Sequence, residues 1–169
     1  DTYNMQSGMH RGTHVQAGPV RGVAIDGLNQ MTISGGADSC VHFWHFKNHQ
    51  RLHTLKLDTQ VSGLKLHRDS GMLAVILDDF SVSVVDIETH RVVRKFHGHT
   101  NSLTDLTFSA DGRWLISAAM DCTVRTWDLP TGRLVDCFQV ESAVTSLTMS
   151  QSGDFLATQH VEDLGVYLW

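Results

Sequence analysis

A repeat of 41 or 42 residues runs through the whole chain, and it restricts the fold more than any other feature. Counting back 42 residues from Trp127 reaches Val85, and 41 more reach Trp44. A further 41 residues lead to Tyr3, and Trp169 lies 42 residues beyond Trp127. A fixed period of this length is typical of proteins that stack one supersecondary unit on the next.

Two neighbouring units align without a gap over about 31 residues. The matched pairs are Leu66 with Phe108, Asp69 with Asp111, Asp79 with Asp121, Val82 with Val124, Arg91 with Arg133 and Phe96 with Phe138. The agreement includes polar positions as well as apolar ones. It therefore indicates repeated structure rather than shared composition.

Each unit has the pattern of four short strands. In the unit 98–139, apolar and polar residues alternate over 103–108, and further strand patterns follow at 114–117, 123–127 and 133–138. Turn residues separate these segments, including the sequence Ser109-Ala110-Asp111-Gly112. Four such strands make one propeller blade, and the absence of a sustained 3.6-residue period predicts almost no helix.

The chain is therefore predicted to be all-β, with four consecutive blades of a WD-type β-propeller. The period and the Trp-Asp pair at 127–128 both match that repeat. We expect residues 1–15 to supply one outer strand that ends a preceding blade. The blades themselves are expected at 16–56, 57–97 and 98–139, with an incomplete blade at 140–169.

The third unit resembles a complete WD repeat, with His99, Ser117, Asp121 and Trp127 at the family's positions. In WD proteins the corresponding side chains form a hydrogen-bonded chain, and the resemblance implies the same chain here. The physical reason is independent of the family. A buried Trp needs an acceptor for its N–H, and a Ser–His–Asp relay supplies one.

The other units retain only part of this set. The first has Gln16 where the His would align, and the second has Val75 and Val85 in place of Ser and Trp. The remaining candidates for structural relays are Ser34, Asp38, Trp44, Asp79, Thr158, Asp163 and Trp169. A catalytic triad occurs once per active site, whereas a structural relay repeats with the blade, so the repetition favours structure over catalysis.

Two carboxylate pairs, Asp78-Asp79 and Glu162-Asp163, could hold a cation or act as acid and base. Their second members align with Asp38 and Asp121, in the same turn of every unit. An Asp that accepts hydrogen bonds from the backbone of a tight turn explains all four positions, and we favour it over a metal site.

Four histidines, His42, His45, His49 and His53, have a nearly helical spacing that would suit zinc on a helix. The repeat instead places the first two on a strand, where they point to opposite faces. We therefore expect solvated surface histidines and no metal or cofactor. The three widely spaced cysteines are expected to be reduced and buried.

A formal net charge of −5 argues against nucleic-acid binding by the fragment as a whole. The most basic stretch, 90–97, contains Arg91, Arg94 and Lys95 and maps to the outermost strand of the second unit. Charges on an exposed edge strand discourage edge-to-edge pairing. Contact of these three residues with RNA is the alternative hypothesis.

Several stretches depart from the general WD pattern and resemble one family, the WD-repeat subunits of the UtpB subcomplex of the small-subunit processome. They are His67–Gly71, Asp78–Thr89, Gly112–Asp121 and Asp163–Trp169. The resemblance implies two tandem propellers followed by a helical domain, with this chain as an open arc of one seven-bladed ring. It also implies a nucleolar location, other UtpB proteins as partners, and pre-rRNA or U3 snoRNA nearby.

The favoured function is a non-enzymatic protein-interaction scaffold that supports 18S rRNA processing. One alternative is a direct RNA-binding module that uses the basic outer strand. Another is a WD-repeat substrate receptor of a ubiquitin ligase. We expect neither membrane association nor a small-molecule substrate, and an enzyme is the least favoured class.

Overall fold

The computed structural model describes residues 1–169 and is built from β-strands alone. Three complete antiparallel sheets follow one another along the chain, and within each sheet the strands pair in sequence order. The first contains β3 (Val20–Ile25), β4 (Met31–Gly36), β5 (Cys40–His45) and β6 (Arg51–Lys56). The second contains β7 (Val61–His67), β8 (Met72–Leu77), β9 (Val82–Asp86) and β10 (Arg91–Phe96). The third contains β11 (Leu103–Phe108), β12 (Trp114–Ala119), β13 (Thr123–Asp128) and β14 (Arg133–Gln139).

A smaller sheet lies at each end of the chain. At the C-terminal end β15 (Val144–Met149), β16 (Leu156–His160) and β17 (Val166–Leu168) form a three-stranded sheet. At the N-terminal end β1 (Thr2–Tyr3) pairs with β2 (His10–Gly12), so the expectation of a single outer strand there was wrong. The chain reverses because the Asn4 side chain accepts the backbone N–H groups of Gln6 and Ser7.

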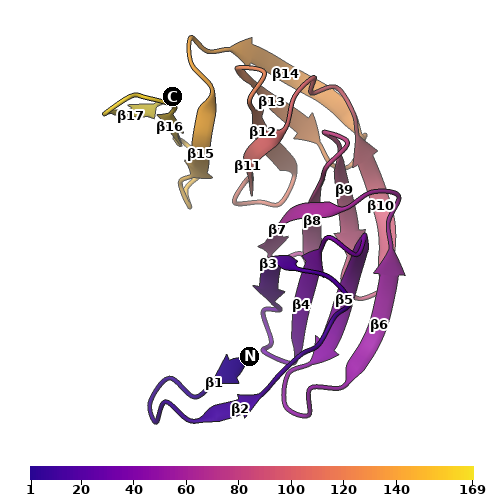
Figure 1. Ribbon diagram of the computed structural model, residues 1–169. Helices are drawn as coiled ribbons and strands as arrows, with labels where there is room; N and C mark the ends of the chain where they lie inside the picture. Colours follow the sequence, from indigo (N-terminus) through magenta and orange to yellow (C-terminus); the bar gives the residue numbers. More distant parts are fainter.

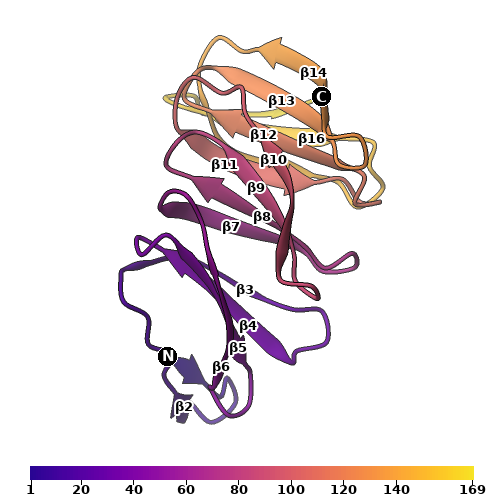
Figure 2. The ribbon, with the colours of Figure 1, turned by 90° about the vertical axis from the view of Figure 1, so that its right-hand side faces the viewer.

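The five sheets form an open arc, which confirms the prediction of an all-β propeller fold (Figure 1). Strands β3, β7, β11 and β15 lie on the concave side, and β6, β10 and β14 lie on the convex side. Figure 2 shows the successive sheets stacked along the arc. No helix long and apolar enough to cross a membrane is present.

The apolar core is divided among the interfaces between neighbouring blades. One cluster joins Ile33 and Phe43 of the first blade to Val75 and Val85 of the second. Two further clusters join the second blade to the third and the third to the fourth. Each blade therefore buries its apolar faces against its neighbours, as expected for a repeat architecture.

The turn between the second and third strands of each blade is held by the expected carboxylate. Asp38, Asp79, Asp121 and Asp163 each accept the backbone N–H of the residue two positions later, at 3.0 to 3.3 Å. In three of these turns the intervening residue has a positive φ near 60°. The prediction of turn capping is confirmed at all four positions.

Candidate interaction sites

A hydrogen-bonded chain of four side chains crosses the third blade. The Trp127 Nε1–H donates to Ser117 Oγ at 2.9 Å, and Ser117 Oγ lies 2.8 Å from His99 Nε2. The other ring nitrogen, His99 Nδ1, lies 3.0 Å from Asp121. Ser117 is fully buried, so its hydroxyl faces the indole and the imidazole rather than a substrate site.

The donors and acceptors of this chain fit one protonation state. Because the indole donates to Ser117, the hydroxyl can donate to His99 Nε2, and His99 Nδ1–H then donates to Asp121. Burial lowers the pKa of His99, which favours the neutral ring. Burial raises the pKa of Asp121, but hydrogen bonds from Thr123, Thr100 and His99 outweigh it and lower the pKa to about 2. The chain therefore ends on a carboxylate that stays charged at neutral pH.

The first blade reaches a similar result with different residues. The Trp44 Nε1–H donates to Ser34 Oγ at 2.9 Å, and the Ser34 hydroxyl donates to Gln16 Oε1 at 2.8 Å. Gln16 thus occupies the acceptor position of the missing His. Asp38 was expected in the same chain, but it pairs instead with His42 Nε2 at 2.8 Å.

The fourth blade also replaces the expected partners. The Trp169 Nε1–H donates to Thr158 Oγ1 at 3.0 Å, and Thr158 lies 2.9 Å from His160 Nε2. Asp163 lies outside this chain and accepts the Tyr167 hydroxyl at 2.5 Å, so its assignment to the relay was wrong. Sequence reasoning missed His160, although residues two apart on a strand share a face.

The second blade has no such chain. Asp79 accepts both the backbone N–H and the hydroxyl of Ser81, at 3.1 and 2.6 Å, and contacts no His. Valines fill the positions of the missing Ser and Trp and are fully buried. The neighbouring Ser83 is also fully buried, and its hydroxyl has no hydrogen-bond partner.

The four histidines of the first blade differ in exposure: His42 is buried, His45 and His49 are half-buried, and His53 is exposed as expected. His42 is buried, with its second ring nitrogen 3.0 Å from Thr54, so the prediction of a solvated surface residue was wrong there. The His42 ring is buried because it lies against the Asp38 carboxylate, the Thr54 hydroxyl and the Trp44 ring, whose centroid is 5.6 Å away. Asp38, Cys40 and His42 lie within 4.8 Å of one another. Burial raises the pKa of the Cys40 thiol, which disfavours the thiolate that a metal would need.

The cysteines differ from the expectation as well. Cys40 and Cys122 are partly buried, whereas Cys137 is exposed. Cys137 lies on β14, the outermost strand of the third blade, where alternate side chains point to solvent. All three thiols are free.

The three cations proposed for RNA contact lie on β10, but two of them have partners within the chain. Arg94 donates to the backbone carbonyl oxygens of Leu129 and Pro130 in the next blade, at 2.8 and 2.5 Å. Lys95 pairs with Asp58. All three are exposed, but only Arg91 has neither a hydrogen bond nor an ion pair within the chain, so this strand presents less free positive charge than its sequence predicts.

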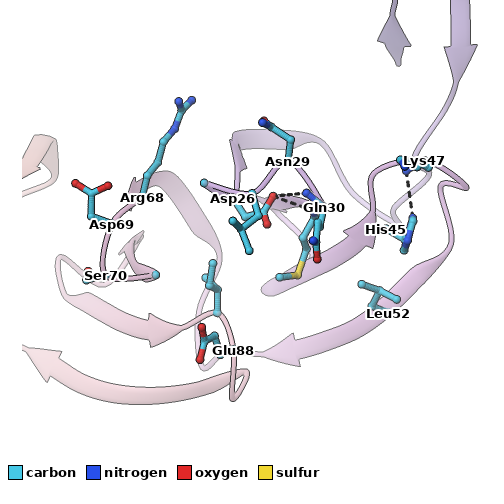
Figure 3. Close-up of a pocket in the computed structure, with 15 residues that line it drawn as sticks. Asp26, Asn29, Gln30, His45, Lys47, Leu52, Arg68, Asp69, Ser70 and Glu88 are labelled. Atoms are coloured by element: carbon cyan, nitrogen blue, oxygen red, sulfur yellow. Dashed lines mark hydrogen bonds between the residues drawn. The ribbon is translucent and has the colours of Figure 1, made fainter.

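A groove of about 840 Å³ opens between the first and second blades (Figure 3). Its walls come from the turn Asp26–Met31, the segment Arg68–Gly71, and the residues His45, Leu52 and Glu88. Asp26 is only 7% exposed. Figure 3 shows the Asp26 carboxylate beside Gln30, with Glu88 on a separate turn below it. No sequence pattern predicted this groove, because its walls come from turns of two different blades.

The whole chain matches one protein family. Residues 1–169 match the WDR36/Utp21 second beta-propeller domain. The chain belongs to this family. It is 56% identical over 173 residues to human WD repeat-containing protein 36, with all of this chain and 19% of that protein covered.

Two yeast relatives carry more informative names. The chain is 43% identical over 168 residues to U3 small nucleolar RNA-associated protein 21 of Saccharomyces cerevisiae, covering 99% of this chain and 18% of that protein. It is 40% identical over 173 residues to the homologous protein of Schizosaccharomyces pombe, covering all of this chain and 19% of that protein. The chain thus spans about a fifth of the length of these relatives.

A designed protein shares the architecture. The crystal structure of the computationally designed Ika4 protein superposes with a TM-score of 0.81, covering 96% of this chain and 98% of that one. Sequence identity is 23%, so this likeness concerns the fold alone.

Proposed function

We propose that this chain is part of a non-enzymatic scaffold that binds other proteins in the particle containing the U3 small nucleolar RNA. The family assignment carries the proposal, because two relatives at 40% and 43% identity are named as U3-associated. We further propose membership of the UtpB subcomplex, a nucleolar location, and a role in 18S rRNA maturation.

The geometry supports a structural role for the Ser–His–Asp chain of the third blade and for the equivalent serine of the first blade. Ser117 Oγ is buried and bonded to an indole, and Ser34 Oγ makes the equivalent contact in the first blade. A nucleophile must instead reach a substrate and a pre-organised oxyanion site. These hydrogen bonds are better explained as supports for the blades, which leaves the faces and rims for partners.

Depletion of the intact protein in cells tests the proposal. We expect mature 18S rRNA to fall and its precursors to accumulate, with rescue by the wild-type protein. The tagged protein should also co-sediment with U3 RNA in pre-ribosomal particles. Normal 18S maturation after complete depletion would contradict the processome role, and association with a ubiquitin ligase instead would favour the receptor hypothesis.

The RNA-contact hypothesis is best tested at one residue rather than by reversing the charge of Arg91, Arg94 and Lys95 together. Reversing the charge of Arg94 would also remove its hydrogen bonds to the third blade. Arg91→Glu changes only an unpaired, exposed charge. If RNA contact at this strand matters, Arg91→Glu should weaken particle association and lower its dependence on salt, because one phosphate contact is lost. If protein contacts dominate, association should be unchanged.

A further inference from the structure

The repeat allows two inter-blade grooves to be compared position by position. Between the second and third blades, Arg94 crosses the groove and donates to the carbonyl oxygens of Leu129 and Pro130. This groove has a volume of about 400 Å³. The equivalent groove between the first and second blades has about 840 Å³. The chain thus seals one groove with its own arginine and leaves the other open.

The open groove lacks the arginine but keeps the acceptors. The strand register places His53 at the position of Arg94, because His53 pairs with Phe43 as Arg94 pairs with Val84. The His53 ring packs against the His90 ring of the second blade at 4.8 Å, but His53 donates no hydrogen bond to the carbonyl oxygens of that blade. The carbonyl oxygens of Ile87 and Glu88 correspond to those of Leu129 and Pro130, and neither accepts a hydrogen bond from the chain.

The open groove also carries a carboxylate that its counterparts lack. In the third and fourth blades, Ser109 and Ser150 cap this turn through a hydroxyl that accepts one backbone N–H. In the first blade, Asp26 Oδ1 accepts the N–H groups of Gln30 and Met31 at 2.8 and 2.9 Å. Asp26 Oδ2 makes no hydrogen bond within the chain, and although the residue as a whole is only 7% exposed, this oxygen is not fully enclosed by the protein. A partly buried carboxylate oxygen without a partner is stabilised by a cationic donor.

We propose that this groove binds an arginine side chain presented by a partner protein. The aliphatic part of the side chain would lie along Leu52 and Ile87, and the guanidinium would reach Asp26 Oδ2, Glu88 and the two free carbonyl oxygens. A guanidinium fits better than an ammonium because its planar fork can serve carboxylate and carbonyl acceptors together, as Arg94 does between the next two blades.

The rim further restricts the partner. Asp69 and Glu88 add negative charge, which disfavours RNA phosphates in this groove. Lys47 and Arg68 also stand on the rim and make no ion pair, and the Arg68 side chain points away from Asp26 (Figure 3). These two cations disfavour a polybasic tail. The groove therefore fits a single arginine within a neutral or acidic protein segment.

Peptide binding to the purified intact protein tests this inference, which rests on the proposed scaffold function. The probe is a fluorescein-labelled octapeptide, Ser-Gly-Leu-Arg-Glu-Leu-Gly-Ser, and its control carries citrulline, a neutral isostere, in place of arginine. We expect saturable binding of the arginine peptide, and at least about 10-fold weaker binding of the citrulline peptide, because hydrogen bonds to charged groups contribute about this much.

Three variants locate the site. Asp26→Ser keeps the turn cap that Ser109 and Ser150 use, and Glu88→Gln removes only charge; each should weaken arginine-peptide binding about 10-fold. His53→Arg supplies an arginine from within the chain and should abolish binding. Asp154→Ser, at an exposed carboxylate outside the groove, is the matched control and should have no effect.

Three results of the peptide assay would overturn the inference. They are equal affinity for the two peptides, no saturable binding of the arginine peptide up to about 1 mM, and binding that none of the three groove variants weakens. If one variant fails to fold, the other two still decide the outcome. An oligouridine probe that binds in an Asp26-dependent manner would favour RNA and also contradict the proposal. None of these results alters the depletion test of 18S maturation, so the two proposals can fail separately.

Discussion

Replacement of Ser117 by Ala tests whether the buried relay stabilises the blade. The Ser117 hydroxyl accepts the Trp127 N–H and contacts His99 Nε2. Because Ser117 is fully buried, bulk water cannot take the place of its hydroxyl in these two hydrogen bonds. The variant would leave two buried polar atoms without partners. At about 1–3 kcal/mol for each, with partial relaxation, Ser117→Ala should lower the free energy of unfolding by about 2–4 kcal/mol.

Ser83→Ala is the matched control, because the same oxygen atom is removed from an equally buried strand position. The Ser83 hydroxyl has no hydrogen-bond partner, so its removal relieves an unsatisfied group instead of creating one. The free energy of unfolding should stay within about 0.5 kcal/mol of wild type or rise by up to about 1 kcal/mol. Urea unfolding of the intact protein, followed by circular dichroism, measures both variants. Equal destabilisation by the two substitutions would refute the role assigned to the relay.

Three further predictions concern stability. Trp127→Ala should lower the free energy of unfolding by about 3–5 kcal/mol and Val85→Ala by about 1–3 kcal/mol, because the valine is smaller and joins no relay. Urea unfolding measures both variants, and equal losses would contradict this prediction. Arg94→Ala should lower stability by about 1–2 kcal/mol through loss of its inter-blade hydrogen bonds, whereas Arg91→Ala should stay within about 0.5 kcal/mol, as thermal unfolding of both variants would show. Asp121 has a pKa lowered from 3.8 to about 2, so its contribution of about 2 kcal/mol should be complete above pH 3.8 and lost as pH falls toward 2. Acid titration of Asp121→Asn should lack that loss, and an unchanged acid profile would count against the hydrogen-bonded carboxylate.

The relays show how repeats diverge without losing their hydrogen bonds. Three tryptophans donate the indole N–H to a Ser or Thr on the preceding strand. They are Trp44 in β5, Trp127 in β13 and Trp169 directly after β17. The next residue in the chain, which accepts from that hydroxyl or contacts it, differs between blades. It is Gln16 in the first blade, His99 in the third and His160 in the fourth. The indole N–H must be satisfied when buried, but several side chains can complete the chain.

The sequence alone determined the repeat, the strand pattern and the turn carboxylates. These features depend on residues close together in the chain: alternation along a strand, and an Asp that caps the backbone two residues later. The same local logic identified His99, Ser117, Asp121 and Trp127, because a complete repeat preserves every member at fixed spacing. The family resemblance was likewise carried by continuous stretches.

Only the tertiary structure decided how side chains pair across strands and blades. Three contacts depend on which atoms meet after folding: the hydrogen bond from Ser34 to Gln16, the Asp38–His42 pair and the contact of Thr158 with His160. The sequence alone predicts that Arg94 is free to contact RNA, whereas in the folded chain it donates to two carbonyl oxygens of the next blade. The open groove lies between turns about 40 residues apart in the chain, so no local pattern could reveal it. Local spacing fixes each blade, but the contacts between blades depend on packing that a linear sequence does not display.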